Sequence, residues 1–260
     1  MLLEAKDLVK GFGSVKAADH ISVSVSPGEV IGMIGANGAG KTTFVNMVTG
    51  YLKPDSGHIV YRGQDITPLQ PRQITQIGIC RSFQVPQVFL TASVFDNLLI
   101  AHGLAESRGI RLLRRLRRTE LVTQVESVLK HYRISDYRDQ RADLLPQGVR
   151  KLLDIAMAVV HNPALVLLDE PTSGVAVSEK FGVMDTVMEA LLNTEVTTLF
   201  VEHDMEIVGR YAKRVLAFYD GAIIADGPPD AVLQDDKVRQ FVIGEELHRP
   251  QHAQEESGHA

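Results

Sequence analysis

Eight consecutive residues have the composition and spacing of a loop that holds phosphate groups. Gly35-Ala36-Asn37-Gly38-Ala39-Gly40-Lys41-Thr42 fits the pattern G-x-x-x-x-G-K-[ST] and follows an apolar run over residues 30–34 that predicts a buried strand. The glycines let backbone N–H groups converge on phosphate oxygens, and the next helix offers its positive N-terminus. Lys41 is placed to reach the terminal phosphates and Thr42 to ligate Mg²⁺. We therefore expect a nucleoside triphosphate site rather than a glycine-rich turn without a ligand.

Two adjacent acids follow a second apolar run. Asp169 and Glu170 come directly after residues 164–168, at the end of a predicted strand where open α/β sheets place their ligands. Asp169 is suited to coordinate Mg²⁺ directly or to hold a group that coordinates it. Glu170 is suited to polarise the water that attacks the γ-phosphate. The alternative is a solvated strand end without a chemical role.

The elements that must position these groups are read from the apolar pattern. Strands are predicted at residues 21–25, 30–34, 77–80, 165–168 and 197–201, with helical patterns after several of them. Between residues 91 and 161 strand signals vanish, and residues 94–101, 120–132 and 149–160 have helix-like spacing. This order predicts an α/β sheet interrupted by a helical insertion.

Composition limits the classes of function. The chain has 260 residues, 45% of them hydrophobic, a net charge of −5 and a pI of about 6.0, so it lacks the basic field of most nucleic-acid binders. We expect no nucleic-acid partner. The acidic start and the lack of about 18 uninterrupted apolar residues predict neither a signal peptide nor a membrane span. The single cysteine, Cys80, allows no internal disulfide and predicts a buried reduced thiol in a cytosolic protein.

In order and spacing, these motifs resemble the ATP-binding subunits of ABC transporters over residues 1 to about 245. The resemblance rests on residues 35–43, on Leu167-Leu168-Asp169-Glu170-Pro171-Thr172, and on Val201-Glu202-His203-Asp204. It implies a phosphate-loop NTPase core with a RecA-like sheet and an antiparallel β subdomain, interrupted by a helical subdomain. The implied division is a core at residues 1–90 and 162–245, a helical subdomain at 91–161 and a polar mobile tail at 246–260.

The same resemblance implies roles for further residues. Phe12 would stack on adenine, Gln84 would touch Mg²⁺ and the attacking water and relay to a membrane partner, and His203 would sense the γ-phosphate. Each has an alternative: Phe12 as a core residue, Gln84 as a polar loop residue, and His203 as a hydrogen-bonded histidine at a strand end. The residues implied to bind the nucleotide are Phe12, Gly35, Asn37, Gly38, Ala39, Gly40, Lys41, Thr42 and Thr43.

The chain departs from the family at the signature, L-S-G-G-Q or L-S-Y-G-Q, whose serine and glycines face the ATP of the opposite subunit. Here Leu145-Pro146-Gln147-Gly148-Val149 takes that place, and proline offers neither a hydroxyl nor an N–H. Ala176 also stands where the family usually has aspartate or asparagine. Pro146 is either a harmless variant of the helix cap or a real loss of catalysis across the subunit interface.

Details such as Arg81-Ser82-Phe83-Gln84 and the ending after Asp226 look like the branched-chain amino acid uptake group, whose relatives handle other amino acids, amides or urea. This implies a peripheral ATPase on the cytoplasmic face of the inner membrane. Its implied partners are a second ATP-binding subunit, a different chain in our prediction, two permease subunits and a solute-binding protein. Alternatives are a catalytically weak ATP-binding partner and a soluble ABC ATPase without transport. The arginine-rich run at 108–118 is either a solvated face or a contact with permease or headgroups.

Overall fold

The computed structural model describes residues 1–106, 119–160, 162–192 and 196–244 of the chain. The arginine-rich run and the polar tail, both of which the sequence singles out, lie outside the described residues. Among the helices of the described part, none is long and apolar enough to cross a bilayer.

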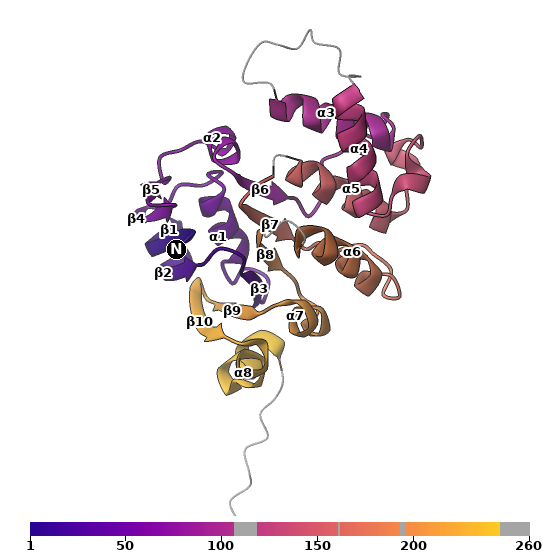
Figure 1. The fold of residues 1–260 in the computed structure, drawn as a ribbon. Coiled ribbons are helices and arrows are strands. Elements are labelled where there is room, and N and C mark those ends of the chain that lie inside the picture. The colour runs from indigo at the N-terminus through magenta and orange to yellow at the C-terminus, as the bar shows by residue number, and fades with distance from the viewer. Residues whose placement is uncertain (107–118, 161, 193–195, 245–260) are drawn as a thin grey trace, which may run out of the picture.

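The larger of two sheets carries the strands that end at the motifs. Its six strands lie in the order β10-β9-β3-β8-β7-β6, and only β10 runs antiparallel to its neighbour. Figure 1 shows this sheet through the middle of the molecule. The strands are β3 (Val30–Gly35), β6 (Ile79–Ser82), β7 (Leu165–Asp169), β8 (Thr197–Val201), β9 (Arg214–Tyr219) and β10 (Ala222–Gly227).

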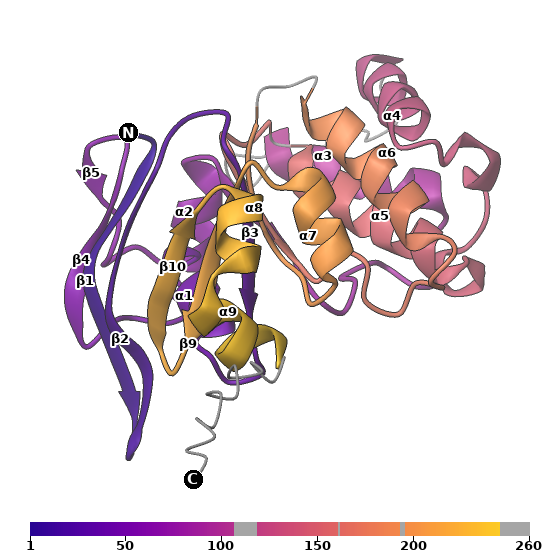
Figure 2. The ribbon, with the colours of Figure 1, turned by 90° about the horizontal axis from the view of Figure 1, so that it is seen from below.

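The smaller sheet is antiparallel and has the order β2-β1-β4-β5. In Figure 2 it stands on one side of the large sheet as a separate layer. The α/β class with a second, antiparallel sheet is thereby confirmed. Its strands are β1 (Leu3–Phe12), β2 (Val15–Val25), β4 (Ser56–Tyr61) and β5 (Gln64–Asp65).

Helices cover the large sheet, and several of them come from the chain between β6 and β7. In both views α3, α4 and α5 lie together on the side of the large sheet away from β1 and β2 (Figures 1 and 2). The α-helices are α1 (Lys41–Val48), α2 (Pro71–Gln76), α3 (Val94–Glu106), α4 (Thr119–His131), α5 (Gln147–Val159), α6 (Lys180–Leu192), α7 (Met205–Tyr211), α8 (Pro229–Gln234) and α9 (Asp236–Val238). Shorter turns are η1 (Ser135–Tyr137), η2 (Ala142–Leu144) and the π-helical η3 (Arg239–Ile243).

Both faces of the large sheet are buried. In β3, Val30 and Ile34 belong to the core under the helices, whereas Ile31 and Met33 belong to the core shared with the small sheet. A strand covered on both faces reads as a continuous apolar run, which is why residues 30–34, 165–168 and 197–201 were visible in the sequence. Cys80 is buried, as predicted.

Several predicted boundaries differ from the observed ones; the helix predicted at 94–101, for example, continues to Glu106. The strand predicted at 77–80 is β6 at Ile79–Ser82, because Ile77 caps α2 and Gly78 turns the chain with φ 98°. The helix predicted from residue 149 begins two residues earlier, at Gln147, because Pro146 with φ −53° and ψ 150° is its N-cap. The strand predicted at 21–25 begins at Val15, and its added residues are mostly polar or exposed.

Candidate nucleotide and hydrolysis site

The phosphate-loop motif forms the turn between β3 and α1, as its sequence predicts. Gly38 and Gly40 have φ of 83° and 106°, which L side chains rarely adopt. A Cβ on Gly40 would also lie 2.7 Å from the carbonyl oxygen of Ala17, so both the backbone conformation and the lack of space require glycine there. No side chain caps the N-terminus of α1. Its first N–H groups therefore remain available to an anion in front of the loop.

Lys41 lies inside this loop. Its side chain is buried, and Nζ donates hydrogen bonds to the carbonyl oxygens of Gly35 at 2.6 Å and Ala36 at 3.0 Å. Burial lowers the pKa of Lys41, and the charges of Glu170 and Asp169 partly oppose that shift. The loop thus holds a positive charge that interacts with the two acids at the end of β7.

A pocket brings the loop together with groups from two other strands. Glu170, directly after β7, and His203, after β8, line it together with Val201 and loop residues Asn37, Gly38, Ala39, Gly40, Lys41, Thr42 and Thr43. The parallel pairing of β3, β8 and β7 carries their carboxyl ends to the same edge of the sheet. Gly35 lies at the end of β3 and does not line the pocket.

The Glu170 side chain joins two of the predicted residues. Its Oε2 accepts a hydrogen bond from Nε2 of Gln84 at 2.8 Å, and its Oε1 lies 3.1 Å from Nε2 of His203. Glu170 itself has φ 48°, an uncommon conformation for a residue with a side chain. Such backbone strain is typical of positions where the surrounding structure fixes a functional group.

Asp169 is held by a residue that the sequence reading did not assign to the site. Its Oδ2 accepts a hydrogen bond from Nη2 of Arg81 at 2.5 Å, and both side chains are buried. Nη1 of the same guanidinium donates to Oδ1 of Asn46 in α1 at 2.6 Å. The pair therefore links β6, β7 and the helix after the phosphate loop. Arg81 stands three residues before Gln84, and nothing in the sequence pairs it with an aspartate so far along the chain.

The oxygen atoms suit the Mg²⁺ that the sequence predicts. Within the described residues, no group of three or more histidine, cysteine or acidic side chains is placed to hold a metal. Mg²⁺ requires no such cage, because it is commonly bound by one or two protein oxygens together with substrate phosphates and water. Thr42 at the start of α1 and Asp169 at the end of β7 offer a hydroxyl and a carboxylate of that kind.

Lys151 was also missed by the sequence reading. It is a further buried charged side chain near the pocket and comes from α5, where only 1% of its surface is exposed. Its Nζ donates hydrogen bonds to the carbonyl oxygens of Glu170 at 3.1 Å, Gln84 at 2.5 Å and Phe83 at 3.4 Å. A lysine among the apolar positions of a helix was the signal that could have found it.

Phe12 lies apart from the pocket. Its ring is 53% exposed at the end of β1, which excludes the alternative of a core residue. The strand β2, which pairs with β1, nevertheless reaches the phosphate loop. The backbone of Ala17 lies against Gly40 of the loop, and the backbone of Lys16 lies against Gly221. Phe12 is therefore an exposed ring on a hairpin anchored beside the loop.

The residues in the place of the signature lie at the start of α5 and do not line the pocket of their own phosphate loop. Pro146 is exposed, and its carbonyl oxygen accepts from the N–H of Arg150. Gly148 is buried, and a Cβ there would lie 3.1 Å from the Val183 side chain. The helix start is thus well formed without a serine.

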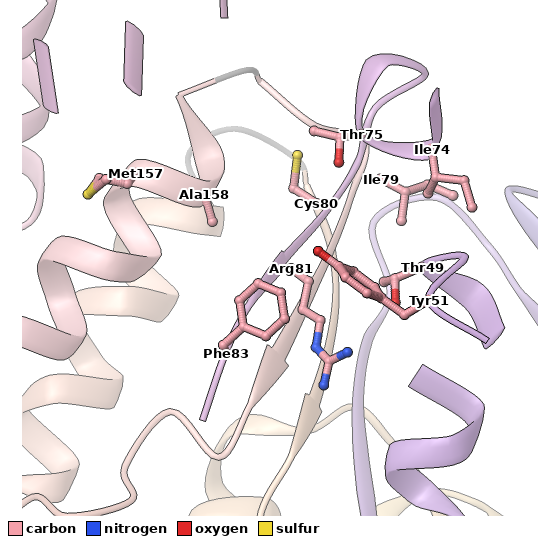
Figure 3. A pocket seen from close by; sticks show the side chains of 10 residues that line it. All are labelled: Thr49, Tyr51, Ile74, Thr75, Ile79, Cys80, Arg81, Phe83, Met157 and Ala158. Carbon is pink, nitrogen blue, oxygen red and sulfur yellow. The ribbon is translucent and has the colours of Figure 1, made fainter. Parts of the chain in front are cut away.

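A second pocket lies behind Arg81, between α1, α2, β6 and α5. Figure 3 shows Arg81 and Phe83 side by side on its wall, and the guanidinium lies 4.9 Å from the ring centroid. The Tyr51 ring lies nearly perpendicular to the same ring, with the two centroids 5.9 Å apart. The side chain that holds Asp169 thereby also lines this second pocket.

The comparisons with known proteins agree with this arrangement. A family model described as ABC transporter matches residues 18–173. The chain is 34% identical to the probable branched-chain amino acid transport ATP-binding protein LivG of Methanocaldococcus jannaschii, over 94% of this chain and 98% of the relative. It is 30% identical to the high-affinity LivG protein of Escherichia coli K12 with the same coverage. A crystal structure of the ADP conformation of an ATP-binding cassette of an ABC transporter superposes with a TM-score of 0.81, at 32% identity, covering 94% of this chain and 99% of that one.

Proposed function

Because the chain belongs to the ABC transporter family, we propose that it is the ATP-binding and ATP-hydrolysing subunit of an import system for a small polar solute. A branched-chain amino acid is the solute class that the names of its relatives suggest, and an amide or urea is the alternative within that group. We propose separate permease subunits, a solute-binding protein and a peripheral position on the cytoplasmic face of the membrane.

One observation carries the proposal for hydrolysis. The Glu170 carboxylate lies at the pocket of the phosphate loop and is held by Gln84 on one oxygen and His203 on the other. In this position it would orient a water molecule in line with the γ-phosphate and accept its developing proton. His203 would contact the γ-phosphate, and Phe12 would stack on the adenine ring from outside the pocket.

The loop would do the binding. Its backbone N–H groups and Lys41 would hold the phosphates, which would displace the Gly35 and Ala36 carbonyls as partners of Nζ. Thr42, Gln84 and Asp169 would hold Mg²⁺. The metal held there would supply positive charge that offsets the charge developing on the phosphate oxygens.

We also propose the division of the chain into a nucleotide-binding core at residues 1–90 and 162–245 and an inserted helical subdomain at 91–161. The position of α3, α4 and α5 between β6 and β7 supports this division. The second ATP-binding subunit would face the Pro146-Gln147-Gly148 segment at the exposed start of α5.

A second candidate function is that of a weakly hydrolysing partner that binds ATP for assembly and gating. Its support is that Pro146 presents no hydroxyl where the family has its signature serine.

The proposed function is tested by separating binding from hydrolysis. Lys41→Ala should weaken binding of a fluorescent ATP analogue, whereas Glu170→Gln should bind it as the parent does and release phosphate at a small fraction of the parent rate. Glu189→Gln, an exposed carboxylate on α6, is the matched control and should change neither. Equal hydrolysis by Glu170→Gln and the parent would remove Glu170 from its proposed role. Binding by Glu170→Gln without hydrolysis by the parent complex would favour the second candidate.

A further inference from the structure

We infer that Lys151 is a positioning residue that fixes Glu170 and Gln84 against each other and ties both to α5. This inference rests on the proposed function, because it concerns how the proposed hydrolytic carboxylate is held.

The first step is the match between donors and acceptors at Nζ. A lysine ammonium has three N–H donors and accepts nothing. Lys151 meets three carbonyl oxygens, those of Phe83, Gln84 and Glu170. Since these belong to the segment after β6 and to the residue after β7, one buried side chain joins the backbones of both residues whose side chains meet at 2.8 Å.

The second step is the strain at Glu170. Its φ of 48° must be maintained by surrounding contacts, because an L residue rarely adopts it alone. The backbone has its N–H bonded to the Val201 carbonyl and its carbonyl bonded to the Ser173 N–H and to Lys151. Lys151 thus holds the Glu170 carbonyl from outside the sheet.

The third step is the second attachment of the same segment to α5. Asp154, three residues after Lys151, accepts a hydrogen bond from the N–H of Gln87 at 2.6 Å. Residues three apart share one helix face. The helix thus holds the segment of residues 83–87 at both ends, by a cation at its start and by a carboxylate at its end.

The consequence is a mechanical link within the chain. Gly148, in the place of the signature, lies one turn before Lys151 on α5. A shift of α5 would be carried by Lys151 to the peptides of Gln84 and Glu170. The start of α5 and the proposed hydrolytic carboxylate are therefore parts of one rigid connection.

The test uses the full-length chain and Lys151→Met, which keeps the length of the side chain and removes its donors. A matched control is Lys53→Met, because Lys53 also donates Nζ to two backbone carbonyl oxygens, those of Thr67 and Leu69, away from the pocket. Turnover is measured by phosphate release at saturating ATP and Mg²⁺. Nucleotide affinity is measured separately with trinitrophenyl-ATP, and the crystal structure of the variant is determined.

We expect Lys151→Met to lower kcat by about tenfold to hundredfold, the range that misplacement of a reacting group by about 1 Å can cause. The affinity for trinitrophenyl-ATP should stay that of the parent, and the crystal structure should show that the Gln84–Glu170 contact is lost. Lys53→Met should leave kcat unchanged. If Lys151→Met does not fold, Lys151→Met with Asp154→Asn removes both buried charges at once, and the asparagine oxygen still accepts from Gln87.

Parent-like kcat in either Lys151 variant, or a Gln84–Glu170 contact that persists in the crystal structure, would overturn the inference. Loss of nucleotide affinity in step with kcat would also overturn it, because it would show a general structural role. Glu170→Gln is measured alongside, because it distinguishes a failure of the proposed function from a failure of the inference about Lys151. If Glu170→Gln hydrolyses ATP like the parent, the proposed role of Glu170 is wrong. If Glu170→Gln is inactive and Lys151→Met is as active as the parent, only the inference about Lys151 is wrong.

Discussion

The buried pair of Arg81 and Asp169 puts a full positive charge beside the carboxylate that we propose as a ligand of Mg²⁺. Removing one partner of a buried ion pair leaves the other charge desolvated and unpaired, whereas an exposed pair of similar geometry is solvated in either case. Arg133 and Glu189 form such an exposed pair at the same separation of 2.5 Å. The chain thus contains its own comparison of buried and exposed arginine pairs.

We predict that Arg81→Met lowers the free energy of unfolding by about 3–5 kcal/mol and that Arg133→Met changes it by about 1 kcal/mol or less. Urea denaturation of the two variants checks this. Adding Asp169→Asn to Arg81→Met should recover much of the loss, because the unpaired charge is removed. Similar losses in the two single variants would show that Asp169 is not desolvated by its surroundings.

Replacing Phe12 should change the affinity for ATP without changing the stability of the protein. If the exposed ring stacks on adenine, Phe12→Ala should weaken ATP binding by about 1–3 kcal/mol, the range for aromatic stacking on a base, and should affect GTP similarly. Because 53% of Phe12 is exposed, the thermal stability of the Phe12→Ala variant should remain close to that of the parent. Phe89→Ala, which removes a ring exposed by 49%, is the control for binding. Unchanged ATP affinity in Phe12→Ala would remove the ring from the site.

At this scale the sequence located the groups that directly follow buried strands. Asp169 and Glu170 could be found because an apolar run precedes them and strand ends meet at one edge of the sheet, whereas His203 was implied by the family resemblance. The partners of Arg81 and Lys151 could not be predicted, because they lie in distant segments of the chain; only the position of Lys151 among the apolar residues of α5 indicated that it is buried. The roles of the located residues stay predictions.

At the scale of elements, α5 combines a buried apolar face with two buried charges, Lys151 and Asp154. Burial raises the pKa of Asp154 to about 6, and the charge of Lys151 and the N–H of Gln87 only partly oppose this. In the unfolded chain the same carboxyl should titrate near 3.8. Between these two pH values the folded protein keeps a proton that the unfolded chain has lost.

Asp154 should therefore make the free energy of unfolding fall as the pH rises from about 4 to about 6, by up to about 3 kcal/mol, and add no further change above that window. Asp154→Asn lacks this titration and still accepts from Gln87. Its stability relative to the parent should rise across the window, as urea denaturation at a series of pH values would show. A difference that is constant with pH would contradict the raised pKa.

Most strands that read as uninterrupted apolar runs were predicted, and strands with polar or half-buried residues were not. The predicted strand at 197–201 matches β8, and that at 165–168 lies within β7, because both are fully buried apolar runs. The sequence reading did not identify β1 or β10, in which many residues are exposed or half-buried and polar residues interrupt the apolar pattern. β9 was also missed, although its run of buried residues was a usable signal.

At the scale of the whole molecule, the signature departure gives the last prediction. The chain keeps Lys41, Gln84, Glu170 and His203 but offers Pro146 to the ATP of its partner, so we propose that it works with a different ATPase whose signature is intact. Loss of one hydrogen bond to a charged phosphate costs about 1.5–3 kcal/mol, enough to slow turnover roughly tenfold or more. Pro146→Ser should then speed ATP hydrolysis by this chain alone.

Pro146→Ala is the matched control, because it frees the backbone in the same way and supplies no hydroxyl. Hydrolysis by the chain alone is compared with that of the chain mixed with its sister subunit and permeases. If the chain alone matches the complex and Pro146→Ser adds nothing beyond Pro146→Ala, the asymmetric model is wrong and the proline is a neutral helix cap.

The strand order also governs when the pocket can come into existence during synthesis. β6 pairs with β7 from Ile79 and Leu165 onward, across the whole inserted helical segment, and β3 pairs with β8 and β9 from the last third of the chain. Contacts between such distant segments form late and slow folding. On the ribosome, the phosphate loop emerges long before Glu170 and His203, and β3 must wait for both of its neighbours. An incomplete chain therefore has the loop without its hydrolytic partners, and we expect no competent ATPase before translation has passed β9.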